Sequence, residues 1–114
     1  MERTPRFVER VFTQAERAYC DSRGAAVAAV HYAARFAAKE ATLKALRTGW
    51  SGGVAWQDVE VVSDETGAPA LIFQRRALEL LEHCGATRAH LSISHTSEHA
   101  IAQVVLERLD AVEK

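Results

Sequence analysis

The sequence predicts one α+β domain in which an antiparallel sheet packs against a long central helix. A stretch rich in Ala and free of Gly and Pro runs from 25 to 46, and apolar runs of strand length follow it in pairs joined by short turns. Helices come first and strands later, an order that favours α+β over a parallel βαβ architecture. The length of 114 residues suits a single domain over residues 1–114.

The first half of the chain is predicted to be helical. Apolar residues recur at helical spacing between 7 and 12, and Thr13 with Glu16 has the form of a capping box, so two short helices or one kinked helix come first. Ala dominates the segment 25–46 and strongly favours one long helix there. Small side chains form a stripe along that helix that lets another element approach closely: Val30, Ala34, Ala37, Ala41 and Ala45.

The second half is predicted to hold four strands and a helix. A Val-rich strand over 54–62 reaches a turn at 63–67, and a second strand over 69–73 returns from it. An amphipathic helix over 74–84 stops at Gly85, the residue type that helix ends favour. Apolar and polar residues then alternate over 88–95, and an apolar run over 100–107 completes a hairpin.

Composition and motifs exclude several classes of function. The formal net charge of -1 gives no general reason to expect binding to nucleic acid. Cys20 and Cys84 lie far apart without a CxxC pair, which favours reduced thiols, and no apolar run has the length of a signal peptide core or a membrane span, so we expect a cytoplasmic protein without a membrane partner. No zinc spacing, phosphate-binding loop or nucleophile elbow is present.

Two side chains on the long helix suggest chemistry. Glu40 and Lys44 share a face one turn apart, and on spacing alone such a pair is most often a surface ion pair contributing about 0.3–0.5 kcal/mol. A carboxylate can also bind a hard cation, and an ammonium can neutralise a phosphate. His95 ends a predicted strand beside a turn, where it is either solvated or close to amides that hold an anion. The residues indicate a magnesium and phosphate site.

The segment RFAAKEATLKAL over 35–46 resembles the signature helix of the holo-acyl-carrier-protein synthases, RFAxKEAxxKAL. Further matches occur in the family's order: VFT at 11–13 with Glu16, WQDVEV at 56–61, GAP at 67–69 and HLSISHT at 90–96. This resemblance implies the 4′-phosphopantetheinyl transferase fold. It also implies magnesium-dependent transfer of 4′-phosphopantetheine from coenzyme A to a serine of an apo-acyl-carrier protein in fatty acid biosynthesis.

The resemblance also implies roles for individual residues. Glu40 would be a magnesium ligand, and Lys44 would act in catalysis beside the phosphates of coenzyme A. Gly49, Pro69 and His95 would contribute to coenzyme A binding. The base that takes the serine proton would be either a metal-bound water or a carboxylate of the metal site.

The expected partners are coenzyme A, the carrier protein and further copies of this chain. Family members are homotrimers with sites between subunits, which would let a small chain bind a large cofactor. The carrier is acidic, and it would dock on a basic face whose alternative interpretation is a solvated surface. That face is formed by Arg3, Arg6, Arg10 and Arg17.

The sequence departs from the family pattern at two places. Nothing before Phe7 resembles the usual first strand, GxDIVxx, so this strand and its metal-binding aspartate are expected to be missing. Arg47 stands where the family often has Gly, ahead of Thr48 and Gly49. The alternative function is therefore a catalytically impaired member that binds carrier proteins or forms trimers.

Overall fold

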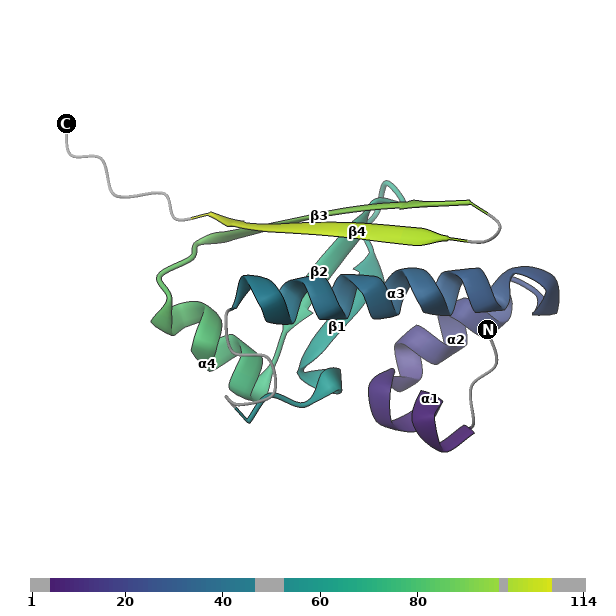
Figure 1. Ribbon diagram of the computed structural model, residues 1–114, viewed down its shortest axis with the longest axis horizontal. Coiled ribbons are helices and arrows are strands. Elements are labelled where there is room, and N and C mark those ends of the chain that lie inside the picture. Colours follow the sequence, from purple (N-terminus) through teal and green to yellow (C-terminus); the bar gives the residue numbers. More distant parts are fainter. Residues whose placement is uncertain (1–4, 47–52, 97–98, 108–114) are drawn as a thin grey trace.

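A computed structural model of the chain describes residues 5–46, 53–96 and 99–107. Its elements follow the predicted order of helices, a strand pair, a helix and a hairpin (Figure 1). In chain order they are α1 (Pro5–Val11), α2 (Gln14–Ser22), α3 (Ala25–Ala45), the 3₁₀ turn η1 (Trp56–Asp58), β1 (Val59–Ser63), β2 (Pro69–Phe73), α4 (Arg75–His83), β3 (Arg88–His95) and β4 (Ala100–Glu107).

The predicted capping box separates α1 from α2. The Thr13 hydroxyl accepts a hydrogen bond from the Glu16 backbone N–H at 3.1 Å, and the Glu16 carboxylate accepts one from the Thr13 N–H at 2.8 Å. These bonds satisfy two of the amide donors that a helix N-terminus leaves without partners. The alternative with two short helices is therefore the one observed.

The strands form two antiparallel ladders, β1 with β2 and β3 with β4. The turn between β1 and β2 is held by Asp64, whose Oδ1 accepts hydrogen bonds from Thr66 and from the Ala68 N–H. Gly67 takes a positive φ of 90° in this turn, which favours Gly. The second ladder runs along α3 and lies beside β2 (Figure 1).

The expected strand over 54–62 is wrong at its N-terminal end. Residues 56–58 form the turn η1 instead, and β1 begins at Val59. Asp58 explains the difference, because its Oδ2 accepts a hydrogen bond from the Ala55 N–H at 3.1 Å and closes the turn. The strands expected over 69–73, 88–95 and 100–107 have the observed bounds.

The hydrophobic core lies between α3, β1 and α4. Buried Leu43 of α3 and Leu46 at its C-cap meet Val59 of β1 and Ala77 of α4 in this core. Of the small-residue stripe on α3, Ala34 is buried, and the other members are only half-buried. The deepest face of α3 is therefore turned away from the expected stripe. Its other buried side chains include two cations, Arg35 and Lys39.

Candidate active site

A cavity of about 160 Å³ opens beside the N-terminal half of α3, and Arg35 is its most unusual residue. Only 5% of Arg35 is exposed, and its guanidinium carbon lies 4.0 Å from the centre of the Tyr19 ring. The Nε atom is buried and has no hydrogen-bond partner among the described residues. A buried N–H without a partner costs free energy, so this atom is suited to an incoming acceptor.

Residues from α2, α3, β1, β2 and β3 line this cavity. α3 contributes His31, β2 contributes Pro69, and β3 contributes His95. The His31 and His95 rings meet edge to face with centroids 5.6 Å apart. Two of the predicted site residues, Pro69 and His95, are thus brought together with Arg35.

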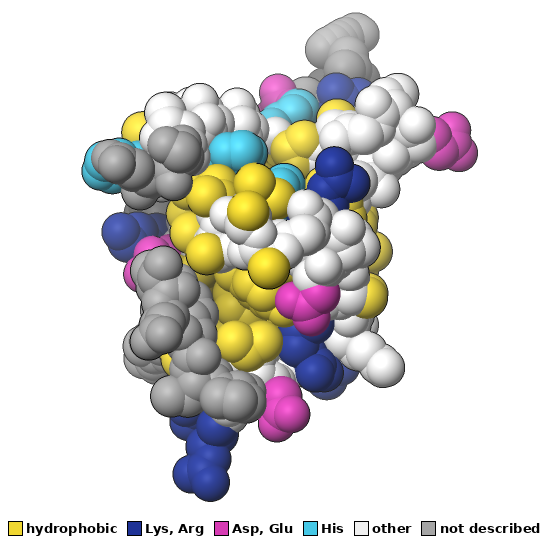
Figure 2. All heavy atoms as spheres, turned by 90° about the vertical axis from the view of Figure 1, so that its right-hand side faces the viewer, with side chains coloured by type: hydrophobic (Ala, Val, Ile, Leu, Met, Phe, Trp, Pro, Cys, Tyr) yellow, Lys and Arg dark blue, Asp and Glu magenta, His cyan; other side chains and the backbone are white. Residues whose placement is uncertain are grey.

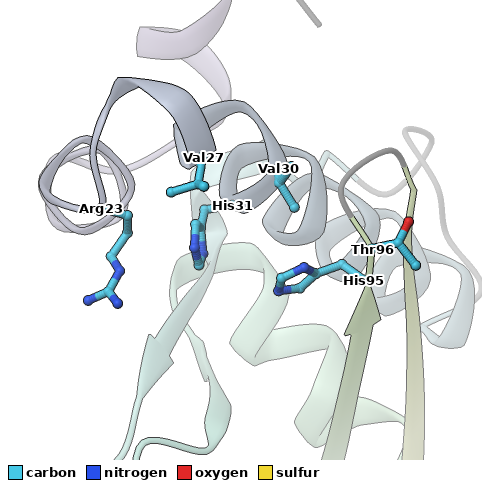
Figure 3. A pocket seen from close by; sticks show the side chains of 6 residues that line it. All are labelled: Arg23, Val27, Val30, His31, His95 and Thr96. Atoms are coloured by element: carbon cyan, nitrogen blue, oxygen red, sulfur yellow. The ribbon is translucent and has the colours of Figure 1, made fainter.

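A second cavity of about 370 Å³ adjoins the first through His31 and His95. In Figure 3, His95 projects from the end of β3 towards His31, and Arg23 lies on the opposite side of His31. Val27 and Val30 of α3 form the apolar part of this cavity. Figure 2 shows histidines (cyan) above a gathering of hydrophobic side chains (yellow) on the face that holds the N-terminal end of α3.

The electrostatics of both cavities favour an anion. Among the described residues that line them are Arg23, His31, Arg35 and His95, and none is an Asp or Glu. Desolvation lowers the pKa of His31 below its ordinary value of 6.5, and the charges of His95, Arg35 and Arg23 lower it further. A phosphate would reverse this effect, because it would offset the surrounding positive charge.

Glu40 and Lys44 lie on a different side of α3. Both are exposed, no ion pair joins them, and neither lines either cavity. Glu40 is five residues from Arg35, which places the two about 140° apart around the helix axis. The two side chains therefore leave α3 in different directions.

The fit of Glu40 to Mg²⁺ follows from its chemistry. Mg²⁺ keeps several waters and commonly takes one or two carboxylates together with substrate phosphates. Glu40 is exposed and forms no ion pair with a described residue, which leaves its carboxylate available for that role. No cluster of three acidic, His or Cys side chains that could hold a metal was found in the described ranges. Glu40 thus fits a metal ion whose other ligands are waters and phosphate oxygens.

The sequence interpretation missed Arg35 and His31 as candidate site residues. Helical spacing could have identified Arg35, because it shares one buried helical face with Lys39, Thr42 and Leu46. A cation on a buried face needs an anionic or polar partner. His31 had no distinguishing spacing. The predicted Gly49 lies outside the described residues, as does Arg3 of the basic face.

Lys39 and Glu16 form a buried ion pair that joins the elements around the site. Their side chains are each 0% exposed, and Lys39 Nζ lies 2.9 Å from Glu16 Oε1. Lys39 Nζ also donates to the carbonyls of Trp56 at 3.1 Å and of Val59. Burial lowers the pKa of Lys39, and the charge of Glu16 opposes that shift.

Comparisons with known proteins agree on one family. The sequence profile of the 4′-phosphopantetheinyl transferase superfamily matches residues 1–104. The chain is 48% identical over 102 residues to a holo-[acyl-carrier-protein] synthase of Koribacter versatilis, covering 90% of this chain and 80% of that protein. It is 50% identical over 100 residues to one from a Geobacter species, with 88% and 78% covered.

The chain belongs to the 4′-phosphopantetheinyl transferase superfamily.

Solved structures of this superfamily share the fold. A Bacillus anthracis holo-(acyl-carrier-protein) synthase in complex with coenzyme A (3′,5′-ADP) superposes with a TM-score of 0.75 at 39% identity, covering 91% of this chain and 82% of that one. The Neisseria meningitidis enzyme gives a TM-score of 0.80 at 32% identity over 91% and 82% of the two chains. The expected 4′-phosphopantetheinyl transferase fold and the family resemblance are confirmed.

No described helix has the length and apolarity that crossing a membrane requires.

Proposed function

We propose that this chain is a magnesium-dependent holo-[acyl-carrier-protein] synthase, which transfers 4′-phosphopantetheine from coenzyme A to a serine of an acyl-carrier protein of fatty acid synthesis. The observation that carries the proposal is the buried Arg35 guanidinium, whose Nε has no partner among the described residues in a cavity without a described carboxylate. Coenzyme A has several phosphates that can accept from this group. The coenzyme A complex of the similar Bacillus anthracis enzyme supports this choice of ligand.

Arg35, His31 and His95 would bind the nucleotide end of coenzyme A. Arg35 would donate to a phosphate, and the two imidazoles and Arg23 would add positive charge around it. Pro69 and Val27 would provide apolar contacts to the rest of the nucleotide. The cavities remain open to solvent on one side, so the phosphopantetheine arm can extend out of them towards the acceptor.

Glu40 and Lys44 would act on the pyrophosphate. Glu40 would hold Mg²⁺ through its carboxylate, and the bound ion would supply positive charge to the pyrophosphate oxygens. The serine hydroxyl forms a bond to the phosphorus next to the pantetheine arm, and the bond from that phosphorus to the bridging oxygen breaks. Lys44 would offset negative charge on the departing adenosine 3′,5′-bisphosphate. The base for the serine proton would be either the Glu40 carboxylate or a water held at the metal site.

A homotrimer with sites between subunits would bring the nucleotide-binding Arg35 and the metal-binding Glu40 to the same coenzyme A. Within one copy, Arg35 and Glu40 leave α3 in different directions, and a neighbouring copy would place the second of them beside the same coenzyme A. The outer face of the β3–β4 hairpin exposes Ile101 and Val105 to 66% and 58%, which is apolar surface that a second copy would cover. These observations support the trimer as the active form.

The carrier protein would dock on α1. Arg6 and Arg10 are exposed there, and Arg10 borders an apolar cavity of about 330 Å³ lined by Phe7, Val11 and Trp56. Cations beside an apolar hollow suit an acidic helix with one apolar side chain. Arg17 is half-buried and less available for such a contact.

Intact-protein mass spectrometry of an apo-acyl-carrier protein tests the proposal. With this chain, coenzyme A and Mg²⁺, we expect the carrier to gain the mass of one phosphopantetheine group, and no gain when Mg²⁺ is chelated. Glu40→Gln should abolish the gain without unfolding the protein, because Glu40 is exposed. The matched control Glu79→Gln changes an exposed carboxylate on α4 and should keep it. Carrier binding without any mass gain would overturn the proposal in favour of a non-catalytic binding module.

A further inference from the structure

We infer that the buried ion pair between Lys39 and Glu16 positions the metal ligand Glu40 by fixing the rotation of α3 about its own axis. Lys39 is then a positioning residue, and it acts through its neighbour in the chain. The inference rests on the proposed function, because it takes Glu40 to be the metal ligand. Three features of the pair carry it: the completeness of its hydrogen bonds, the origin of its partners and its position beside Glu40.

The hydrogen bonds of Lys39 are complete. A charged ammonium has three N–H donors, and Lys39 Nζ has three acceptors: Glu16 Oε1, the Trp56 carbonyl and the Val59 carbonyl. The two carbonyls flank the junction between η1 and β1, while Glu16 belongs to α2. Acceptors from two sides confine the ammonium in direction as well as in distance. The Lys39 side chain therefore fixes α3 against both α2 and the start of β1.

Glu16 extends the same connection to its other neighbours. Its Oε1 accepts from the Thr13 N–H at 2.8 Å, and its Oε2 accepts from the Val61 N–H at 2.7 Å. The Thr13 hydroxyl in turn donates to Glu60 of β1 at 2.6 Å. One carboxylate thus joins the N-terminus of α2, strand β1 and helix α3.

Buried ion pairs are not in general a source of stability. Replacing such a pair by apolar side chains of similar volume is often neutral or stabilising, because both charges lose their hydration on burial. An apolar pair would fill the same space between α2 and α3. It would not supply directional contacts to the Trp56 and Val59 carbonyls. The ion pair adds to the core packing a directional constraint on the rotation of α3.

That rotation sets the location of the Glu40 carboxylate. Glu40 follows Lys39 directly, is exposed, and forms no ion pair with any described residue, so its own contacts do not orient it. Side chains extend about 6 Å from a helix axis, so a rotation of about 10° moves a side-chain atom by about 1 Å. A displacement of about 1 Å at a reacting centre can lower a rate about a hundredfold. A small rotation of α3 would therefore strongly change metal binding by Glu40 and the rate of transfer.

The double variant Glu16→Leu/Lys39→Met separates positioning from stability. Urea unfolding reports whether the variant is folded, and electron paramagnetic resonance of Mn²⁺ in the presence of coenzyme A reports the metal site without requiring transfer. We expect a folded protein in which the Mn²⁺ dissociation constant and the half-saturating Mg²⁺ concentration for transfer both rise at least about tenfold.

Two further variants make the outcome decisive. Glu79→Gln removes a carboxylate from another ion pair, the one with Arg76 at 3.0 Å on the surface of α4, and should leave both metal constants unchanged. Glu16→Gln keeps the shape of the side chain, and it tests whether the pair positions Glu40 if the double variant does not fold. It should raise the Mn²⁺ dissociation constant and the half-saturating Mg²⁺ concentration several-fold, because one charged hydrogen bond is lost.

The inference is overturned if a folded pair variant binds metal as the unmodified chain does, or if Glu79→Gln weakens metal binding to the same extent. Failure of the proposed function has a different signature. In that case the unmodified chain transfers no phosphopantetheine, while the Mn²⁺ titration still measures the effect of the pair on the site.

Discussion

Arg35 and Lys39 are two buried cations one turn apart on the same helix, and their surroundings differ. The three donors of Lys39 have three acceptors, one of them the buried carboxylate of Glu16. Arg35 stacks on Tyr19, and its Nε is without a partner among the described residues. Burial of a charge is costly unless the charge is paired. The difference indicates that Lys39 belongs to the framework, whereas Arg35 is held ready for an anionic ligand.

The surroundings of the two residues are consistent with this division. Lys39 is enclosed by α2 and β1 and lines none of the cavities of about 370, 160 and 330 Å³. Arg35 lines a cavity with two histidines and no described carboxylate. One helix thus combines a closed, fully paired region with an open, cationic one. Substitutions that remove one cation at a time should therefore have separable effects on stability and on ligand binding.

The largest expected effect is on stability at Lys39. Lys39→Met leaves Glu16 buried without its cation, and breaking a buried pair in this way costs about 3–5 kcal/mol of unfolding free energy. Urea denaturation followed by circular dichroism measures the loss. The matched control is Lys44→Met, which removes an exposed ammonium from the same helix and should change stability by less than about 0.5 kcal/mol. Equal losses of unfolding free energy for Lys39→Met and Lys44→Met would contradict a structural role of the Lys39 ion pair.

The second largest expected effect is weaker binding of coenzyme A when Arg35 is replaced. Arg35→Met should raise the KM for coenzyme A about ten- to a hundredfold, since a hydrogen bond to a charged group contributes about 1.5–3 kcal/mol. Ligand-free stability should fall by less than about 1 kcal/mol, because the main loss is the contact with Tyr19. Steady-state transfer kinetics give the KM. The control Arg76→Met, on the exposed side of α4, should have a normal KM, and a normal KM for Arg35→Met itself would contradict the assignment.

The smallest expected effect is the pH dependence at His31. Its pKa in the folded protein lies below 6.5, so the unfolded chain binds the proton more readily. Stability should therefore fall as the pH decreases through 6.5 towards the folded pKa, and His31→Gln should reduce this slope. NMR titration of the imidazole measures the pKa directly. Added adenosine 3′,5′-bisphosphate should raise it, and a ligand-free pKa at or above 6.5 would contradict the cationic surroundings described for this residue.

Most of the fold follows from local sequence patterns. The turn at 63–67, the capping box at Thr13 and the alternating strands of the C-terminal hairpin all depend on residues near each other in the chain. The turn η1 was missed because the strand pattern of Val and Trp continues through it. Its geometry depends on Asp58 and on the donation from Lys39, which is distant in sequence.

The site was predictable only in part. Family resemblance identified His95 and Pro69, which the structure brings together, and Glu40 and Lys44, whose roles remain predictions. Arg35 was part of the quoted signature but received no role, since helical spacing alone does not reveal an unpartnered guanidinium. The pairing of Lys39 with Glu16 spans α2 and α3, and no local pattern specifies it.

The division between Arg35 and Lys39 is tested most directly by measuring the unfolding free energy of Arg35→Met with and without saturating coenzyme A. A ligand that binds only the folded state adds about 2.7 kcal/mol at a concentration one hundred times its Kd. We expect Arg35→Met to lose most of the increment that the unmodified chain gains, while its ligand-free stability stays nearly unchanged. An undiminished increment, or a ligand-free loss as large as that of Lys39→Met, would contradict the assignment of Arg35 to the ligand and Lys39 to the framework.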